Sequence, residues 1–268
     1  MSKKEYQPRN KMNKRLRNMF KVMCIALVVA ALLYLINTIF LTSSSTKIDM
    51  QDVQLTQLDA LEGNINEGDP IAIITTNLGE IRAVLYLEEA PNTVQSFIDL
   101  AESGYYDNSY VFRVQEDTYF AGGSYDREGN LNEDTFSEEA ETIKQEVTSN
   151  LWPFKGAFCS LSSKSNCSGS RFMVLNSITF DEETTSELLA IDEDTRLADA
   201  FIEYGGIPNF SQQMTIFAQT YQGFDVIDKI CSQEVEDEDT LIPSGDIIIE
   251  KIEISTYHKD DSIGDSGK

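Results

Sequence analysis

The sequence contains very little histidine and cysteine. Its single histidine, His258, lies in the polar C-terminal end of the 268-residue chain. A Ser–His–Asp or Cys–His catalytic centre and a site with several histidine ligands are therefore excluded. The four cysteines are too few and too scattered for a disulfide scaffold, and no CxxC pair is present that would indicate a zinc ribbon or a thioredoxin-like centre. We expect neither a metal site nor a cofactor.

Basic side chains are scarce and unevenly distributed. The chain has 21 Lys and Arg residues against 45 Asp and Glu residues. Eight of the basic residues lie within residues 1–42, beside a single acid, Glu5. The rest of the chain is strongly acidic, which repels phosphate and argues against nucleic-acid binding. The acidic runs 191–195 and 234–239 lack the glycine and glutamate spacing of an EF-hand, so we interpret them as solvated surface.

One long apolar run, residues 22–41, contains no charged side chain. As a helix it would be about 30 Å long, the thickness of the hydrocarbon core of a bilayer. Because cations immediately precede it, the positive-inside rule predicts a single-pass anchor in the cell membrane, with residues 1–21 cytoplasmic and the C-terminal part outside. A signal peptide cleaved near 43–45 is the alternative, although its apolar region would be shorter.

The remainder divides by composition into three parts. We expect a polar stalk at 42–69 and a globular domain at 70–257, in which residues 178–208 form an insert. The polar residues 258–268 are expected to be a disordered tail.

Short β-rich runs dominate the domain. Residues 71–76 and 80–87 flank a glycine-containing turn and predict a hairpin. Apolar residues at i, i+3, i+4 and i+7 from Val94 predict a helix that opens at Pro91 and ends at Gly104. Further strands are expected at 110–114, 118–123, 156–162, 170–176, 214–220 and 246–255, and a further helix at 224–230. The insert is predicted to contain a helix with Leu197, Ala198, Phe201 and Ile202 on one face and Gly205 at its end. A few helices among many short strands favour a closed antiparallel barrel over a βαβ sheet.

Several stretches carry motifs in a fixed order. Residues 78–114 contain Gly-x-Ile, then Ala-Pro-x-Thr-Val-x-x-Phe, Gly-Tyr-Tyr and Phe-x-Arg-Val; Gly122-Gly123 follows, then GAFCSLSS, GSRFMVL (169–175) and the segment 203–230. Together they resemble the cyclophilin family of peptidyl-prolyl cis–trans isomerases, in a divergent, membrane-anchored bacterial form. The resemblance implies a mainly β fold: a closed eight-stranded antiparallel barrel capped by two helices, here preceded by one transmembrane helix.

Isomerisation of an X-Pro bond requires a catalyst that removes amide resonance, a barrier of about 18–20 kcal/mol. A cation that donates a hydrogen bond to the prolyl nitrogen, beside apolar walls that hold the ring, would stabilise the twisted state. Arg113 matches the catalytic arginine of the family. We expect it on the strand face opposite Phe112 and Val114, which are predicted to face the core. Without the motif, a surface arginine would be the default interpretation.

The resemblance also identifies substrate-binding positions, several of which depart from the family. The predicted set is Thr118, Tyr119, Ala121, Ser162, Arg171, Met173, Asn209, Phe210 and Met214. Ala121 and Arg171 replace two glutamines of the family, and Ala121 cannot support a substrate carbonyl or the arginine as glutamine does. Met173 replaces a phenylalanine of the proline pocket, and Asn209 replaces a Trp or His. The site therefore keeps its cation and apolar character and loses polar and aromatic supports.

Two functions remain open from the sequence. The first is a prolyl isomerase, with either full or reduced activity, that acts on exported proteins outside the cytoplasmic membrane. The second is a non-catalytic cyclophilin-like module that binds proline-containing partners. A third hypothesis is a structural surface protein in which the barrel serves only as a spacer. Cys159 and Cys167 are compatible with either a disulfide or free thiols.

Overall fold

A computed structural model of the chain describes residues 53–131, 142–191 and 196–259. The expected cytoplasmic segment 1–21 and the apolar run 22–41 lie outside these ranges, as does most of the expected tail. Within the described ranges, no helix is both long enough and apolar enough to span a membrane.

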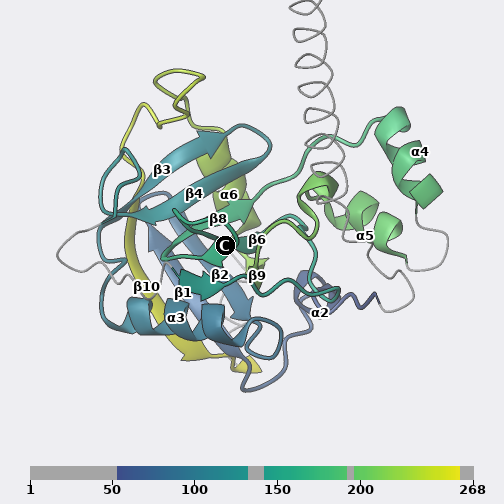
Figure 1. Cartoon of the computed structure of the whole chain (residues 1–268), viewed down its shortest axis with the longest axis horizontal. Coiled ribbons are helices and arrows are strands. Elements are labelled where there is room, and N and C mark those ends of the chain that lie inside the picture. Colours follow the sequence, from purple (N-terminus) through teal and green to yellow (C-terminus); the bar gives the residue numbers. More distant parts are fainter. Residues whose placement is uncertain (1–52, 132–141, 192–195, 260–268) are drawn as a thin grey trace, which may run out of the picture. The chain divides into compact units, whose positions relative to one another are not determined.

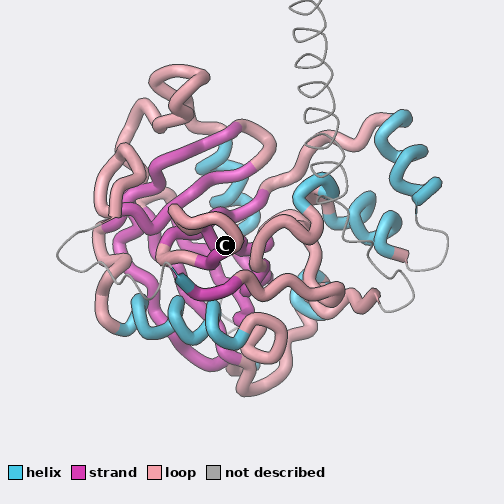
Figure 2. The backbone as a smooth tube through the Cα atoms, in the orientation of Figure 1, coloured by secondary structure: helices cyan, strands magenta, loops and turns pink. Residues whose placement is uncertain are grey.

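Eight antiparallel strands form the closed barrel that the sequence predicts (Figures 1 and 2). The strands follow one another around the barrel in the order β1-β10-β3-β4-β8-β6-β9-β2. Their bounds are β1 Pro70–Thr76, β2 Gly79–Leu85, β3 Ser109–Gln115, β4 Tyr119–Ser124, β6 Ala157–Leu161, β8 Arg171–Leu175, β9 Ile216–Gln222 and β10 Ile248–Thr256. A separate pair, β5 (Ile143–Lys144) and β7 (Cys167–Ser168), forms a small two-stranded sheet.

The hairpin β1–β2 shows how local chemistry sets the register. Thr76 pairs with Gly79 at the end of the ladder. The Thr76 hydroxyl accepts hydrogen bonds from the backbone N–H groups of Leu78 and Gly79, both at 3.1 Å. Gly79 has a φ of +147°, and a Cβ there would lie 2.5 Å from Val226, so this turn requires glycine.

The two predicted capping helices are present. Helix α3 (Pro91–Glu102) packs against β10 and β9, and helix α6 (Phe224–Cys231) packs against β2, β4 and β3. Apolar side chains of both helices join the barrel core, including Phe97 and Ile227. Phe97 lies 5.1 Å from Phe217 and 5.9 Å from Phe172, measured between ring centroids.

Within its described residues, the insert 178–208 contains the helices α4 (Glu182–Ile191) and α5 (Leu197–Tyr204). The 3₁₀ turn η3 (Pro208–Phe210) begins at the last residue of the insert. The predicted α5 is confirmed, and its Phe201 ring lies 4.7 Å from that of Phe154. Ile202, which we placed on the same apolar face, is instead exposed.

The segment 53–69 differs from the expected stalk, because it packs on the barrel. It contains the short helix α2 (Leu58–Leu61), and Ala60 and Ile65 are buried with Tyr257. Gln57 has no exposed surface; its Nε2 donates to the Trp152 carbonyl at 2.9 Å. Polar composition suggested a solvated stalk, but these side chains find partners far along the chain.

Two further expectations are resolved by the described residues. His258, at the start of the expected tail, contacts Glu67 through Nδ1 at 2.7 Å. Cys159 and Cys167 are both free thiols, so the disulfide left open by the sequence is not formed. Cys159 is buried, and that burial raises the pKa of its thiol far above the ordinary value.

Candidate active site

Arg113 lies on β3, where the ladder is irregular. The register of β3 against β4 shifts between Val111 and Arg113, which pair with Gly122 and Ala121. Phe112 is therefore the extra residue of a bulge, a feature that changes the direction of side chains along a strand. The expectation that Phe112 faces the core was wrong: Val111 and Val114 belong to the barrel core, whereas Phe112 does not.

Phe112 is instead covered on the outer surface of the barrel. It is 7% exposed, and a Cβ on Gly129 would lie 2.5 Å from its ring. The guanidinium carbons of Arg113 and Arg171 lie 5.5 Å and 5.8 Å from the centroid of that ring. Both distances fall within the range of cation–π attraction, so the ring holds two cations close together.

Arg113 is half-buried and fixed by backbone carbonyls. Its Nη1 donates to the carbonyl oxygens of Phe112 at 2.9 Å and Glu128 at 3.4 Å. Among the described residues, no carboxylate forms an ion pair with Arg113, and only Nη1 donates to a protein acceptor. The guanidinium thus keeps donor capacity beyond these two contacts.

Cross-strand neighbours of Arg113 form an apolar row. Arg113 lies opposite Ala121, Ala121 opposite Met173, and Met173 opposite Cys159. Cross-strand partners project from the same face of a sheet, so the row runs away from the guanidinium along the outer face. Met173 is 4% exposed and belongs to a cluster with partly buried Tyr119, Phe210 and Met214. The structure therefore brings five of the predicted side chains onto one face beside Arg113.

Besides Arg171, three predicted residues lie outside this row and cluster. The Thr118 hydroxyl donates to the Glu116 carbonyl in the turn between β3 and β4. The Ser162 hydroxyl accepts from the backbone N–H of Lys164, after the end of β6. Asn209 is exposed, and its carbonyl accepts from Gln213.

Arg171 binds a loop rather than the apolar row. Its Nη1 donates to the Gly129 carbonyl at 2.5 Å, and its Nη2 donates to the Ser163 hydroxyl at 2.7 Å. Its Nε is buried without a partner in the described part of the chain. The two arginines therefore dock on the adjacent carbonyls of Glu128 and Gly129.

The loop 126–130 was not identified from the sequence as part of the site. Asp126 Oδ1 accepts from the N–H groups of Glu128, Gly129 and Asn130, which folds the loop into a tight turn. Burial raises the pKa of Asp126, but these hydrogen bonds outweigh that effect and hold the pKa below its ordinary value. The sequence DREGN (126–130) is typical of a turn, but it does not predict that the turn lies over Phe112.

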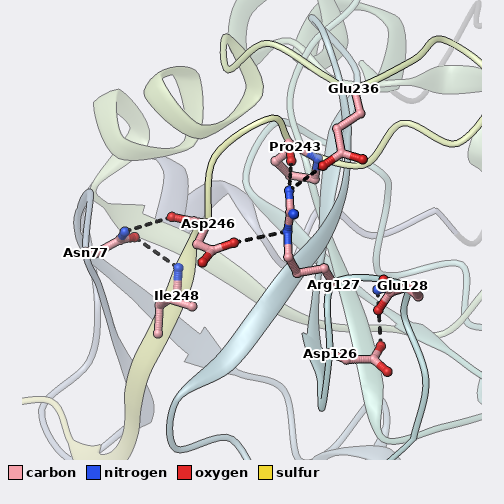
Figure 3. Close-up of polar contacts among 8 residues, drawn as sticks. All are labelled: Asn77, Asp126, Arg127, Glu128, Glu236, Pro243, Asp246 and Ile248. Atoms are coloured by element: carbon pink, nitrogen blue, oxygen red, sulfur yellow. Dashed lines mark hydrogen bonds and ion pairs between the residues drawn. The ribbon is translucent and has the colours of Figure 1, made fainter.

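Arg127 anchors the same loop to the segment before β10 (Figure 3). Its Nη2 donates to Glu236 at 2.8 Å and to the Pro243 carbonyl at 2.5 Å, and its Nε pairs with Asp246 at 3.0 Å. The loop is thereby held from both sides, because Arg127 binds the segment before β10 and the two site arginines bind the carbonyls of the loop.

Two cavities of the described structure lie away from Arg113. One, of about 450 Å³, lies between the segment 53–69 and the end of β2; a second of similar volume adjoins β5. Neither is lined by Arg113 or by any of the other predicted site residues. The candidate active site is the face of the barrel beside the guanidinium, because Arg113 and the apolar row lie there together.

The described domain is a closed antiparallel barrel whose outer face presents an arginine beside an apolar row. Comparison with known proteins makes this specific. The sequence model of the family described as cyclophilin type peptidyl-prolyl cis-trans isomerase/CLD matches residues 71–254. The chain belongs to this cyclophilin-type isomerase family.

Similar proteins agree with the family. A Streptococcus pyogenes serotype M6 protein with the provisional name bifunctional phosphatase/peptidyl-prolyl cis-trans isomerase is 31% identical over 206 residues, 76% of this chain and 42% of that protein. A Staphylococcus aureus (strain USA300) protein with the provisional name peptidyl-prolyl cis-trans isomerase is 28% identical over 194 residues, 72% of this chain and 96% of that protein. The chain thus spans under half the length of the first relative and nearly all of the second.

A solved structure shares the fold. It is a Cryptosporidium parvum cyclophilin type peptidyl-prolyl cis-trans isomerase, crystallised in the presence of the dipeptide Ala-Pro. The match has a TM-score of 0.53 and 22% sequence identity, and it covers 70% of this chain and 99% of that one.

Proposed function

We propose that this cyclophilin-type isomerase acts on proline-containing segments of exported proteins, outside the cell membrane, with Arg113 as the catalytic cation. The observation that carries this proposal is the position of the guanidinium. It lies at the end of the row Ala121–Met173, where an apolar proline ring and a hydrogen-bond donor would meet. The Ala-Pro dipeptide in the solved relative supports the same class of substrate.

The guanidinium of Arg113 is a hydrogen-bond donor of fixed orientation. Two carbonyls hold Nη1 of Arg113, so the orientation of the planar fork is set before a substrate binds. A further N–H of that fork, donated to the prolyl nitrogen, favours the pyramidal nitrogen over the planar imide. The interaction is therefore stronger in the transition state than in the ground state, which is the condition for catalysis.

The rate is expected to be low. Ala121 presents a methyl group directly opposite Arg113, where the family resemblance places an amide. A preorganised donor of this kind commonly contributes about 10²–10³ in rate. We infer that the protein is a weak isomerase that retains the catalytic arginine, Arg113.

The location is proposed from the N-terminal sequence. Residues 22–41 carry no charge and follow eight basic residues, which supports a single-pass anchor with a cytoplasmic N-terminus. The barrel would then lie outside the membrane, beside proteins that fold after export.

A protease-coupled assay with an Ala-Pro peptide, on the full chain in detergent, tests the catalytic role. Arg113→Ala should lower kcat/KM by about 10²-fold. Arg82→Ala is the matched control, because Arg82 is also a half-buried strand arginine but pairs with Glu80 at 2.7 Å. Equal rates for wild type and Arg113→Ala, with both folded, would remove Arg113 from the mechanism.

A second function, binding of proline-containing partners without turnover, is favoured by Ala121. NMR exchange spectroscopy separates the two. Cis and trans signals of a bound peptide that exchange faster than those of the free peptide support the isomerase. Saturable binding without faster exchange supports the binding module.

A further inference from the structure

One hydrogen bond joins the guanidinium of Arg113 to a residue outside its own strand. Its Nη1 donates to the carbonyl of Phe112, which is also on β3, and to the carbonyl of Glu128 at 3.4 Å, in the loop 126–130. Ala121, opposite Arg113 in the ladder, has no polar side-chain atom that could take part. Within the described residues, the loop therefore supplies the one hydrogen-bond acceptor outside β3 that orients Arg113.

The loop also acts on Arg113 through the ring of Phe112. The guanidinium carbon of Arg113 lies 5.5 Å from the centroid of this ring, within the range of cation–π attraction. Gly129 lies against the same ring, since a Cβ at that position would be 2.5 Å from it. A displacement of the loop would thus move a carbonyl that Arg113 binds and uncover the ring on which it rests.

Arg127 fixes the position of this loop through three contacts with the segment 234–247 (Figure 3). Its Nη2 donates to Glu236 at 2.8 Å and to the Pro243 carbonyl at 2.5 Å, and its Nε pairs with Asp246 at 3.0 Å. Because two nitrogens of a planar fork are held at once, both the distance and the direction of the side chain are set.

The segment 234–247 is itself attached to the strand that carries Arg113. The backbone N–H of Val114 donates to the Leu241 carbonyl, and that of Val111 donates to the Ile247 carbonyl, both at 2.9 Å. The same segment thus pairs with the backbone of β3 on both sides of Arg113 and, through Arg127, holds the loop that orients the side chain.

Asn77, in the turn between β1 and β2, ties the end of this segment to the barrel (Figure 3). Its Nδ2 donates to the Asp246 carbonyl at 3.0 Å, and its Oδ1 accepts from the backbone N–H of Ile248, also at 3.0 Å. The carboxylate of Asp246 is therefore presented to Arg127 from a fixed backbone.

The ion pairs of Arg127 are too exposed to be important for the stability of the whole fold. The side chains of Arg127, Glu236 and Asp246 are 33%, 47% and 58% exposed. Exposed ion pairs contribute little to the free energy of unfolding. The consequence of these contacts is local, namely the placement of the loop over Phe112.

We propose that Arg127 is a positioning residue for the isomerase reaction. It holds the loop 126–130 where the Glu128 carbonyl and the Phe112 ring orient the guanidinium of Arg113, and it acts only through Arg113. The proposal rests on the catalytic role proposed for Arg113.

The protease-coupled assay, on the full chain in detergent, tests it with Arg127→Gln. We expect kcat for an Ala-Pro peptide to fall about tenfold while KM changes less than about twofold, because the apolar row that receives the proline ring is untouched. Arg82→Gln, which removes a strand arginine paired with Glu80 at 2.7 Å, is the matched control and should keep the wild-type kcat. A raised KM at unchanged kcat, or an equal fall in kcat in the control, would overturn the proposal.

Asp246→Asn removes the same anchor with the opposite change of charge. If Arg127 acts by placing the loop, kcat falls in both Arg127→Gln and Asp246→Asn. If it acts only through its electric field, the loss of a cation and the loss of an anion shift kcat in opposite directions. Opposite shifts, or wild-type kcat in both variants, would overturn the proposal.

A double-mutant cycle shows whether Arg127 acts through Arg113. Added to Arg113→Ala, Arg127→Gln should change kcat/KM by less than about twofold, since no guanidinium is left to orient. Effects that multiply would overturn the proposal. An NMR signal of the Arg113 Nε–H, assigned by its loss in Arg113→Ala, should shift in Arg127→Gln and stay in place in Arg82→Gln; an unmoved signal in Arg127→Gln would overturn the proposal as well.

The same variants separate the failure of this proposal from that of the proposed function. A wild-type rate in folded Arg113→Ala would overturn both, because there would be no catalytic arginine to position. A slow Arg113→Ala beside an Arg127→Gln with wild-type kcat would overturn the positioning role alone.

Discussion

Arg113 and Ala121 are directly opposed in the β3–β4 ladder, so a methyl group faces the one arginine that the family motif identifies as catalytic. Ala121 is 2% exposed and is followed on its other side by Met173. The site therefore has a fixed cation and an apolar row, and the amide expected between them is missing. This pair of residues suggests that turnover is limited by support of the arginine and the substrate carbonyl.

Ala121→Gln should raise kcat/KM for an Ala-Pro peptide by about tenfold, since a preorganised amide commonly contributes 10² or more to the rate where it stabilises the transition state. The protease-coupled assay measures it. Ala121→Met is the matched control, because methionine has similar length and no amide. An equal gain in both variants would attribute the effect to apolar packing instead.

Gly129→Ala should destabilise the domain and loosen the loop over Phe112. Gly129 has a φ of +93°, and its Cβ would lie 2.5 Å from the Phe112 ring. The left-handed backbone alone costs about 1–2 kcal/mol for a residue with a side chain. Gly68→Ala isolates that cost, because Gly68 has a φ of +90° and nothing within 4 Å. We expect a lower Tm for Gly129→Ala than for Gly68→Ala; equal values would mean that the loop moves aside freely.

The barrel was predictable because its strands follow local patterns. The turn at Gly79 and the apolar spacing from Val94 are visible within a few residues, and all eight expected strands are present. The bulge that turns Phe112 to the outer face of the barrel could not be predicted from the sequence. A β-bulge adds one residue to a strand but requires no particular residue type, so it is recognised only from the pairing of that strand with its neighbour.

Contacts between residues that lie far apart along the chain could not be predicted from the sequence. Gln57 is a polar residue in a polar segment, and nothing nearby in the sequence signals that its partners are Trp152 and Gln219. The carbonyls of Glu128 and Gly129 were missed in the same way, because a backbone carbonyl has no residue type by which to recognise it. Arg113 was found only because the family motif identifies it.

Acid should weaken the attachment of α3 through Glu146. No side chain of the N-cap residue Ala90 caps this helix; Glu146 instead accepts from the backbone N–H groups of Asn92 at 3.1 Å and Thr93 at 2.8 Å. Burial raises the pKa of Glu146, but the hydrogen bonds from Thr93 and Asn92 outweigh it, so the net pKa is lowered. A lowered folded-state pKa contributes stability above the unfolded value, about 4.3, that is lost as pH falls through the folded value.

Glu146→Gln is accordingly expected to lower the Tm at pH 7, by an amount that shrinks as the pH falls below the unfolded value of about 4.3 and the wild-type carboxyl takes up its proton. Thermal unfolding from pH 3 to pH 7 measures this. Glu102→Gln, an exposed residue at the other end of α3, should leave the profile unchanged. A Tm difference that stayed constant across the range would show that the charge of Glu146 is unimportant.

Gln57→Leu should destabilise the domain, because Gln57 joins the segment 53–69 to the barrel. Its Nε2 donates to the Trp152 carbonyl and to Gln219 Oε1 at 2.8 Å, and its Oε1 accepts from the Trp152 N–H at 2.5 Å. Leucine fills a similar volume but leaves the buried Trp152 N–H without an acceptor, which costs about 1–3 kcal/mol. Urea unfolding measures the loss, and Gln54→Leu, an exposed glutamine of the same segment, is the control. A free energy of unfolding equal to that of the control would mean that this segment detaches from the barrel at little cost, and the cavity that it walls would then lack a fixed shape.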